Sequence, residues 1–344
     1  MTYDAPSKGE WQRLYELSHA VKELAPWEWM EEDEVFGLKD PETGELHLVS
    51  IMGTLGEHFA TAVYLGNKGL HGFFDMQRFP AGLSAQRLLE IPQLHASYEN
   101  RDQVQREDRE VMKMLGHKYR GRYAWPLFRS YRPGYVPWLI ESHEARLLAH
   151  ALEQVRLMAP RVRQDPELLQ REDEDKLLVR VPHKQHGQLT WRDKKMSVPP
   201  PETVRYMSRV DGEALESLAQ AQHVLEAVEI DVSLLPVHVG KRGERPVIPY
   251  LLLVADAQSG MILANDMLQA DPTLKEMWSS VPGVIVDTLA ELDLRPEVVR
   301  ASEPLLLGLL QPLQEELGIE IEAREELPAV EAARQGLEKH LERG

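Results

Sequence analysis

Apolar residues recur along this chain at two spacings, one typical of helices and one typical of strands. The first run has helical spacing and starts behind Ser7 and Glu10, which stand three residues apart as in a capping box. Pro26 ends it. The apolar residues that share this predicted helix face are Trp11, Leu14, Tyr15, Leu17, Val21 and Leu24.

Short apolar runs separated by turn residues follow and predict a small antiparallel sheet. The predicted strands are 35–38, 46–51 and 60–65, with a turn at 66–69 after the third. The predicted helices after them are 84–90, 105–115 and 141–158. The N-terminal third is therefore expected to be an α+β unit.

The middle of the chain breaks this regularity. Residues 160–176 are polar and contain the acidic run 171–175, which is typical of a linker. Residues 177–181 and 188–191 predict a hairpin, and Pro199–Pro201 separates it from the rest. We therefore predict an α+β domain at 1–160, an acidic linker with a hairpin at 161–205, and a second domain at 206–344.

The second domain has the clearest pattern. Its long first strand alternates, with Val228, Ile230 and Val232 on one face and Glu229 and Asp231 on the other. The elements predicted around it, in chain order, are helix 212–223, strands 224–239, 250–255 and 261–264, a helix from 272 interrupted at Pro282, strand 298–301, helix 304–317, strand 319–323 and helix 329–341. This order predicts a three-layer α/β domain.

Composition and charge restrict the function. A hydrophobic content of 43% and a charged content of 28% are typical of a globular protein. The chain has no cysteine, no apolar run long enough to span a membrane and no N-terminal signal pattern, so we expect a cytoplasmic protein without membrane association. The net charge of −17 repels a polyanion, which makes nucleic acid an unlikely partner.

The second domain resembles the catalytic core of integrases, a ribonuclease-H-like family. Val228-Glu-Ile-Asp231-Val-Ser233 is similar to the family's first strand, which carries a catalytic Asp. Leu251-Leu-Leu-Val-Ala-Asp256-Ala-Gln-Ser-Gly260 is similar to its second strand and the turn after it. Glu331 stands in order where the family has a catalytic Glu at the start of a helix. The resemblance covers about the last third of the chain and implies a fold with a possible metal site.

The chain departs from this family after the fourth strand. Where the family has its second catalytic Asp, this sequence has Ser302 followed by Glu303. Two-metal phosphoryl transfer needs carboxylates that hold two cations about 4 Å apart, and a serine hydroxyl carries no charge. The catalytic hypothesis therefore relies on Asp231, Glu303 and Glu331, with Asp231 and Glu331 binding Mg²⁺ or Mn²⁺.

The polar residues of this domain also have a purely structural interpretation. In that interpretation Glu229 and Asp231 line a solvated sheet face, Asp256 starts a turn and Ser302 caps a helix. No metal or other cofactor is then required, and whether the protein is an enzyme stays open, with a non-catalytic role favoured.

Residues 113–138 are locally basic and rich in aromatic side chains within this acidic protein. Arginines interleaved with aromatic residues occur in protein–protein hot spots and at single-stranded nucleic acids. The simpler interpretation is an irregular loop whose arginines pair with nearby carboxylates. The candidate binding residues of this basic-aromatic segment (Lys113–Trp138) are Arg120, Arg122, Trp125, Arg129 and Arg132.

The whole chain also resembles an uncharacterised bacterial family with two domains of unknown function. The resemblance rests on Ala25-Pro-Trp-Glu-Trp29, Ile51-Met-Gly53 with Tyr64-Leu-Gly66, Gly121-Arg-Tyr-Ala-Trp-Pro126 and Pro133-Gly-Tyr135. It implies two domains and no particular chemistry. The leading hypothesis is a binding or scaffold protein with a degenerate ribonuclease-H-like domain and a protein partner on the basic-aromatic segment. The alternative is a divergent metal-dependent nuclease or phosphoryl-transfer enzyme.

Overall fold

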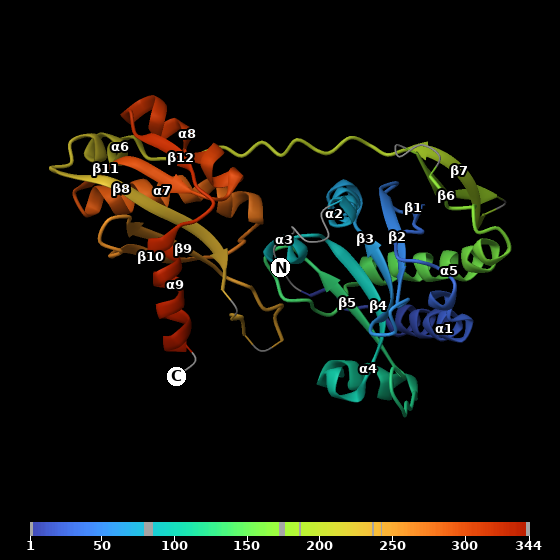
Figure 1. Cartoon of the computed structure of the whole chain (residues 1–344). Coiled ribbons are helices and arrows are strands. Elements are labelled where there is room, and N and C mark those ends of the chain that lie inside the picture. The colour runs from blue at the N-terminus through green and yellow to red at the C-terminus, as the bar shows by residue number, and fades with distance from the viewer. Residues whose placement is uncertain are drawn as a thin grey trace. The chain divides into compact units, whose positions relative to one another are not determined.

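The computed structural model describes residues 3–78, 85–171, 176–185, 187–235, 237–241 and 243–341. The chain forms two compact units, Met1–Glu202 with Gly243–Arg245, and Thr203–Arg242 with Pro246–Gly344 (Figure 1). Most of the acidic run, residues 172–175, lies outside the described residues, as does the predicted helix start Ser84.

The first unit is built on a seven-stranded sheet with the order β5-β4-β3-β2-β1-β6-β7. Its strands are β1 (Phe36–Lys39), β2 (Leu46–Met52), β3 (Phe59–Tyr64), β4 (Gln93–Glu99), β5 (Trp125–Tyr131), β6 (Lys176–Gln185) and β7 (Gln188–Ser197). Only the β1–β6 pair is parallel among these neighbours, so the sheet is mixed.

Helices cover both faces of this sheet. The helical segments are α1 (Lys8–Leu24), η1 (Pro26–Glu28), α2 (Gly66–Arg78), α3 (Ala85–Leu89), η2 (Arg101–Gln103), α4 (Arg106–Leu115) and α5 (Ser142–Gln164). The larger core joins α1, α4 and α5 to one sheet face, and a smaller core joins α2 to the other. The predicted capping box at the start of α1 is confirmed, since Ser7 and Glu10 each accept from the other's backbone N–H.

Several expectations for the first unit were wrong. The sheet is neither small nor purely antiparallel, and the hairpin assigned to the linker forms β6 and β7, with β6 pairing beside β1. The predicted turn 66–69 is the first turn of α2. The basic-aromatic segment (Lys113–Trp138), for which an irregular loop was the simpler interpretation, contains β5. This strand pairs with β4, which is distant in the sequence, and it shows no clear alternation of apolar and polar residues.

The second unit has a five-stranded mixed sheet with the order β10-β9-β8-β11-β12. Its strands are β8 (His223–Leu234), β9 (Tyr250–Asp256), β10 (Ile262–Leu268), β11 (Leu294–Ala301) and β12 (Glu320–Ala323). The first three are antiparallel neighbours, whereas β11 runs parallel to both β8 and β12. The predicted order of elements is confirmed, although β8 ends five residues before the predicted strand end at 239.

Helices also lie on both faces of the second sheet (Figure 1). They are α6 (Gly212–Ala219), α7 (Leu274–Glu291), α8 (Pro304–Leu317) and α9 (Pro328–Leu341). The first three share a core with Val228, Ile230 and Val232, while α9 packs against Leu251, Leu253 and Ala255 on the opposite face.

The interruption predicted in α7 does not occur. Pro282 lies inside a continuous helix and is buried, together with Val281, Ile285 and Val286. An internal proline costs about 3 kcal/mol, and burying each of three aliphatic side chains contributes about 1.5–3 kcal/mol. Packing against the sheet therefore outweighs the local preference of the proline.

Candidate functional site

The polar face of β8 is where the ribonuclease-H-like resemblance predicts chemistry. Glu229 on this face is only 4% exposed, and its Oε2 accepts hydrogen bonds from the backbone N–H groups of Ala329 at 2.7 Å and Val330 at 3.1 Å. These are unpaired donors of the first turn of α9, where a carboxylate also meets the positive end of the helix dipole. Glu229 therefore caps α9.

Asp231, two residues further along the same face, also binds α9. Its Oδ2 accepts from a terminal guanidinium nitrogen of Arg334 at 2.5 Å, and its side chain is 12% exposed. The expectation that Glu229 and Asp231 line a solvated face was therefore wrong. The face is covered, and both carboxylates hold the covering helix.

The other two candidate carboxylates occupy helix starts. Glu303 is the N-cap of α8 and its Oε1 accepts from Leu305 N at 3.5 Å, so the cap is Glu303 and not the predicted Ser302. Glu331 lies exposed in the first turn of α9. Among the residues that the structure describes, no three histidine, cysteine, aspartate or glutamate side chains come together as metal ligands. Asp231, Glu303 and Glu331 are thus not gathered into a metal site.

Asp256 starts a turn, as predicted. Its carboxylate accepts from the backbone N–H groups of Gln258 at 3.3 Å and Ser259 at 3.0 Å and from the Ser259 hydroxyl. The hydrogen bond from the Ser259 hydroxyl is the main reason why the pKa of Asp256 lies below its usual value. This residue stabilises the β9–β10 connection.

In the basic-aromatic segment, Arg129 is engaged within the protein. Its guanidinium binds both carboxylate oxygens of Asp108 on α4, at 2.8 and 2.6 Å, and the two residues are 9% and 6% exposed. This bidentate geometry is the strongest form of an arginine–carboxylate contact. Arg129 therefore fixes α4 against the edge strand β5.

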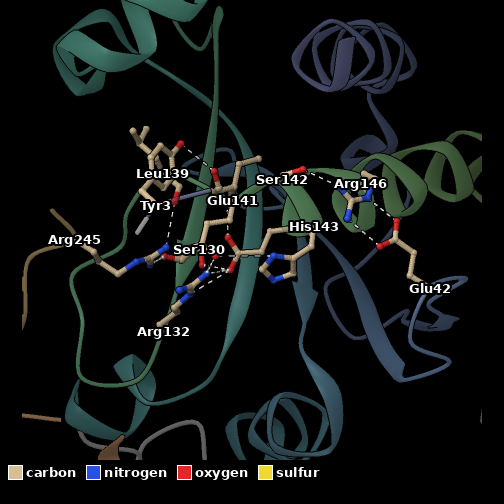
Figure 2. A network of polar contacts seen from close by, with 12 residues as sticks. Tyr3, Glu42, Ser130, Arg132, Leu139, Glu141, Ser142, His143, Arg146 and Arg245 are labelled. Carbon is tan, nitrogen blue, oxygen red and sulfur yellow. Dashed lines mark hydrogen bonds and ion pairs between the residues drawn. The ribbon is translucent and has the colours of Figure 1, made fainter. Parts of the chain in front are cut away.

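Arg132 is engaged in the same way at the start of α5 (Figure 2). Its terminal nitrogen lies 2.8 Å from Glu141 Oε2 and 3.0 Å from Glu144 Oε1, and the Ser130 hydroxyl donates to Glu144 Oε1 at 2.7 Å. Glu144 is 4% exposed, and its second oxygen accepts from the backbone N–H of Glu141. The network joins the end of β5 to the first turn of α5.

The remaining candidates of this segment differ in availability. Trp125 is half-buried, and its indole N–H is enclosed without an acceptor among the described residues. Arg120 and Arg122 are exposed, and neither forms an ion pair with a described residue. The guanidinium of Arg122 lies 5.4 Å from the centre of the Tyr123 ring. Of the five predicted binding residues, these two arginines are the ones open to a partner.

Sequence reasoning missed a pocket in the first unit. It has a volume of about 320 Å³ and lies among the N-terminal segment, α1, α4 and β5. Tyr3 is one of its lining residues and donates from its hydroxyl to Ile140 O at 3.1 Å. Burial, assisted by Glu141 and Glu144, raises the pKa of Tyr3 to about 12. Trp11 and Tyr15 were recognisable from the sequence as part of an apolar helix face. Periodicity could not predict that α4 lies beside them.

These features define a two-domain protein of mixed α/β class, and comparison with known families agrees. Residues 11–180 match a family described as a domain of unknown function, DUF7309, and residues 214–338 match a second, DUF6930. No curated protein and no solved structure matches the chain. Within the described residues, no helix combines the length and apolar character required to cross a membrane.

Proposed function

We propose that this chain is a non-catalytic binding protein of the cytoplasm whose second unit is a degenerate ribonuclease-H-like domain. The resemblance implies three antiparallel strands followed by alternating helix and strand, and the second unit has this order with β8 at the centre of its sheet. The strand order supports the fold relationship and says nothing about activity.

The contact between Arg334 and Asp231 carries the non-catalytic part of the proposal. A catalytic aspartate in this position has to face two divalent cations, and here it faces a guanidinium at 2.5 Å. Glu229 is occupied by the backbone of α9. A cation would have to displace Arg334, and no nearby described group of three ligands would receive it.

Calorimetric titration of Mn²⁺ tests this proposal. We expect no saturable binding by the full chain and the same weak signal from Asp231→Ala. Asp266→Ala, which removes an exposed carboxylate from β10, is the matched control. Saturable binding that Asp231→Ala loses and Asp266→Ala keeps would support the metal-dependent nuclease instead. Mg²⁺-dependent cleavage of a phosphodiester substrate would have the same meaning.

The exposed turn at Arg120 and Arg122 is the surface we propose for a protein partner. The protein carries a net charge of −17, whereas Arg120 and Arg122 form no ion pair with a described residue and lie beside exposed Lys118. An acidic partner surface would complement this local positive charge. Arg129, which is buried, and Arg132, which is half-buried, form ion pairs within the first unit and contribute to the fold of this surface.

A charge reversal tests this surface without disturbing the buried ion pairs. Arg120→Glu with Arg122→Glu should abolish retention of a specific partner on immobilised protein. Lys184→Glu with Arg192→Glu, on the exposed β6–β7 hairpin, changes the net charge equally and should leave retention intact. Equal retention by both variants would remove the turn from consideration.

A further inference from the structure

Four aromatic residues line the pocket in the first unit, and the rings of three of them pack together. Trp11 and Tyr15 come from α1 and Phe128 from β5. The ring centres of Tyr15 and Phe128 lie 5.1 Å apart, and those of Trp11 and Phe128 lie 6.0 Å apart. Its volume of about 320 Å³ is at the small end of the range for ligand sites, about 300–1,000 Å³.

Every charged residue that lines the pocket is acidic: Glu107, Asp108 and Glu110, all on α4. Asp108 is neutralised by Arg129, and Glu110 accepts from Arg106 at 2.8 Å on the exposed side of the helix. Glu107 is half-buried and forms no ion pair or hydrogen bond with any described side chain. Within the described residues, Glu107 is therefore a carboxylate of the pocket without an ion-pair partner, and its position beside aromatic rings favours a cation and repels an anion.

The residues that line the pocket also supply two polar groups, the Tyr15 hydroxyl and the Trp11 indole N–H. Tyr15 is 2% exposed and Trp11 is 6% exposed. Among the described residues, nothing accepts from the Tyr15 hydroxyl or the Trp11 indole N–H, although both atoms stay in contact with solvent. Hydrogen-bonding groups that line a pocket and have no acceptor among the described residues are available to a ligand with a polar group of its own.

We propose that this pocket binds a small organic cation. Its ammonium group lies against the rings of Trp11 and Phe128 near the carboxylate of Glu107, and its polar substituent bonds to the Tyr15 hydroxyl and the Trp11 N–H. The assignment does not depend on the second unit, so it stands or falls separately from the non-catalytic role proposed above.

Calorimetry with choline as the probe tests the proposal on the full chain. Choline carries a trimethylammonium group and a hydroxyl, and 3,3-dimethyl-1-butanol has the same shape without the charge. We expect choline to bind at least about tenfold more tightly than the alcohol, a difference of about 1.4 kcal/mol, because only the cation is attracted by the aromatic faces and the carboxylate. Equal affinities, or no saturable choline binding up to about 10 mM, would overturn the proposal.

Two conservative variants test which side chains of the pocket contact choline. Glu107→Gln should weaken choline binding about fivefold or more, whereas Glu28→Gln, an exposed glutamate outside the pocket, should not change it. Tyr15→Phe removes a hydroxyl that has no hydrogen-bond partner among the described residues, so the melting temperature should stay the same. Choline affinity should fall, whereas tetramethylammonium affinity should not.

The same variants separate a free cation from one carried by a peptide. A trimethyl-lysine peptide could bind more tightly than choline and lose affinity in Glu107→Gln. That result would support an ammonium group near Glu107, and it would overturn the assignment of a small molecule as the ligand. Unchanged choline binding in both Glu107→Gln and Tyr15→Phe would place the ligand elsewhere and contradict the inference.

Discussion

Arg334 on α9 and Asp231 on β8 lie 103 residues apart in the sequence and bind each other through a guanidinium nitrogen and Oδ2 at 2.5 Å. The contact fixes the last helix over the sheet face that would have to hold the cations under the alternative of a metal-dependent nuclease. We expect Asp231→Asn and Arg334→Met each to destabilise the second unit, with a coupling energy of about 1–3 kcal/mol because the aspartate is largely buried. Urea unfolding of both single variants and the double variant measures this coupling. The more exposed pair Arg209–Glu276 is the control and should couple by less than about 1 kcal/mol.

Glu229 should matter more for α9 than its position on a strand suggests. Glu229→Gln removes the charge that accepts two backbone hydrogen bonds and should cost about 1–2 kcal/mol. Hydrogen exchange gives the specific readout, since the amides of Ala329 and Val330 should lose protection. Glu226→Gln changes an exposed glutamate of the same strand and should leave the protection of the Ala329 and Val330 amides as in the wild type. Equal exchange in both variants would show that Glu229 does not cap the helix.

Arg129 should be essential for the stability of the first unit. Arg129→Gln leaves Asp108 buried without its bidentate partner, and breaking such a buried pair costs about 3–5 kcal/mol. Arg120→Gln alters an exposed arginine of the same segment and should change the free energy of unfolding by less than about 0.5 kcal/mol. Chemical denaturation followed by circular dichroism compares the two. A similar loss in both would argue against the buried pair.

The first unit should lose stability in mild acid. Burial lowers the pKa of His47 from 6.5 to about 4, and its Nδ1 accepts from Gly66 N at 3.0 Å. The folded state therefore favours the neutral imidazole, so its contribution is present above pH 6.5 and declines as the pH falls toward 4. The loss should reach about 3 kcal/mol.

Denaturation of His47→Asn at a series of pH values isolates this effect. The asparagine oxygen can accept from Gly66 N and does not titrate, so the decline between pH 6.5 and 4 should become shallower. His183→Asn, at an exposed histidine, should keep the wild-type slope. An unchanged slope in His47→Asn would assign the acid sensitivity to other groups, among which buried His95 is the first to test, since burial lowers its pKa to about 3.

Local patterns in the sequence were sufficient for most elements of the second unit. The alternation at Val228, Ile230 and Val232 correctly predicted which residues face the core, because strand side chains point to opposite faces in turn. Gly318 ends α8 in the left-handed conformation, with a φ of 68°, as its place after the apolar run predicts. The same reasoning failed for β4 and β5, whose polar residues His95, Ser97 and Arg129 are buried by neighbours distant in the sequence.

The sequence by itself determined the succession of helices and strands in the second unit, the two-domain organisation and the set of carboxylates and arginines available for chemistry. Only the tertiary structure decided how those charges are used. Asp231 could have faced a metal or an arginine, and the choice depends on where α9 packs, which is a long-range consequence of burying Val330 and Ala333 against β9. The pocket at Trp11 and Tyr15 has the same origin, because α1, α4 and β5 meet only when the sheet is assembled. Periodicity reports which face of an element is apolar, and it carries no information about which distant element covers that face.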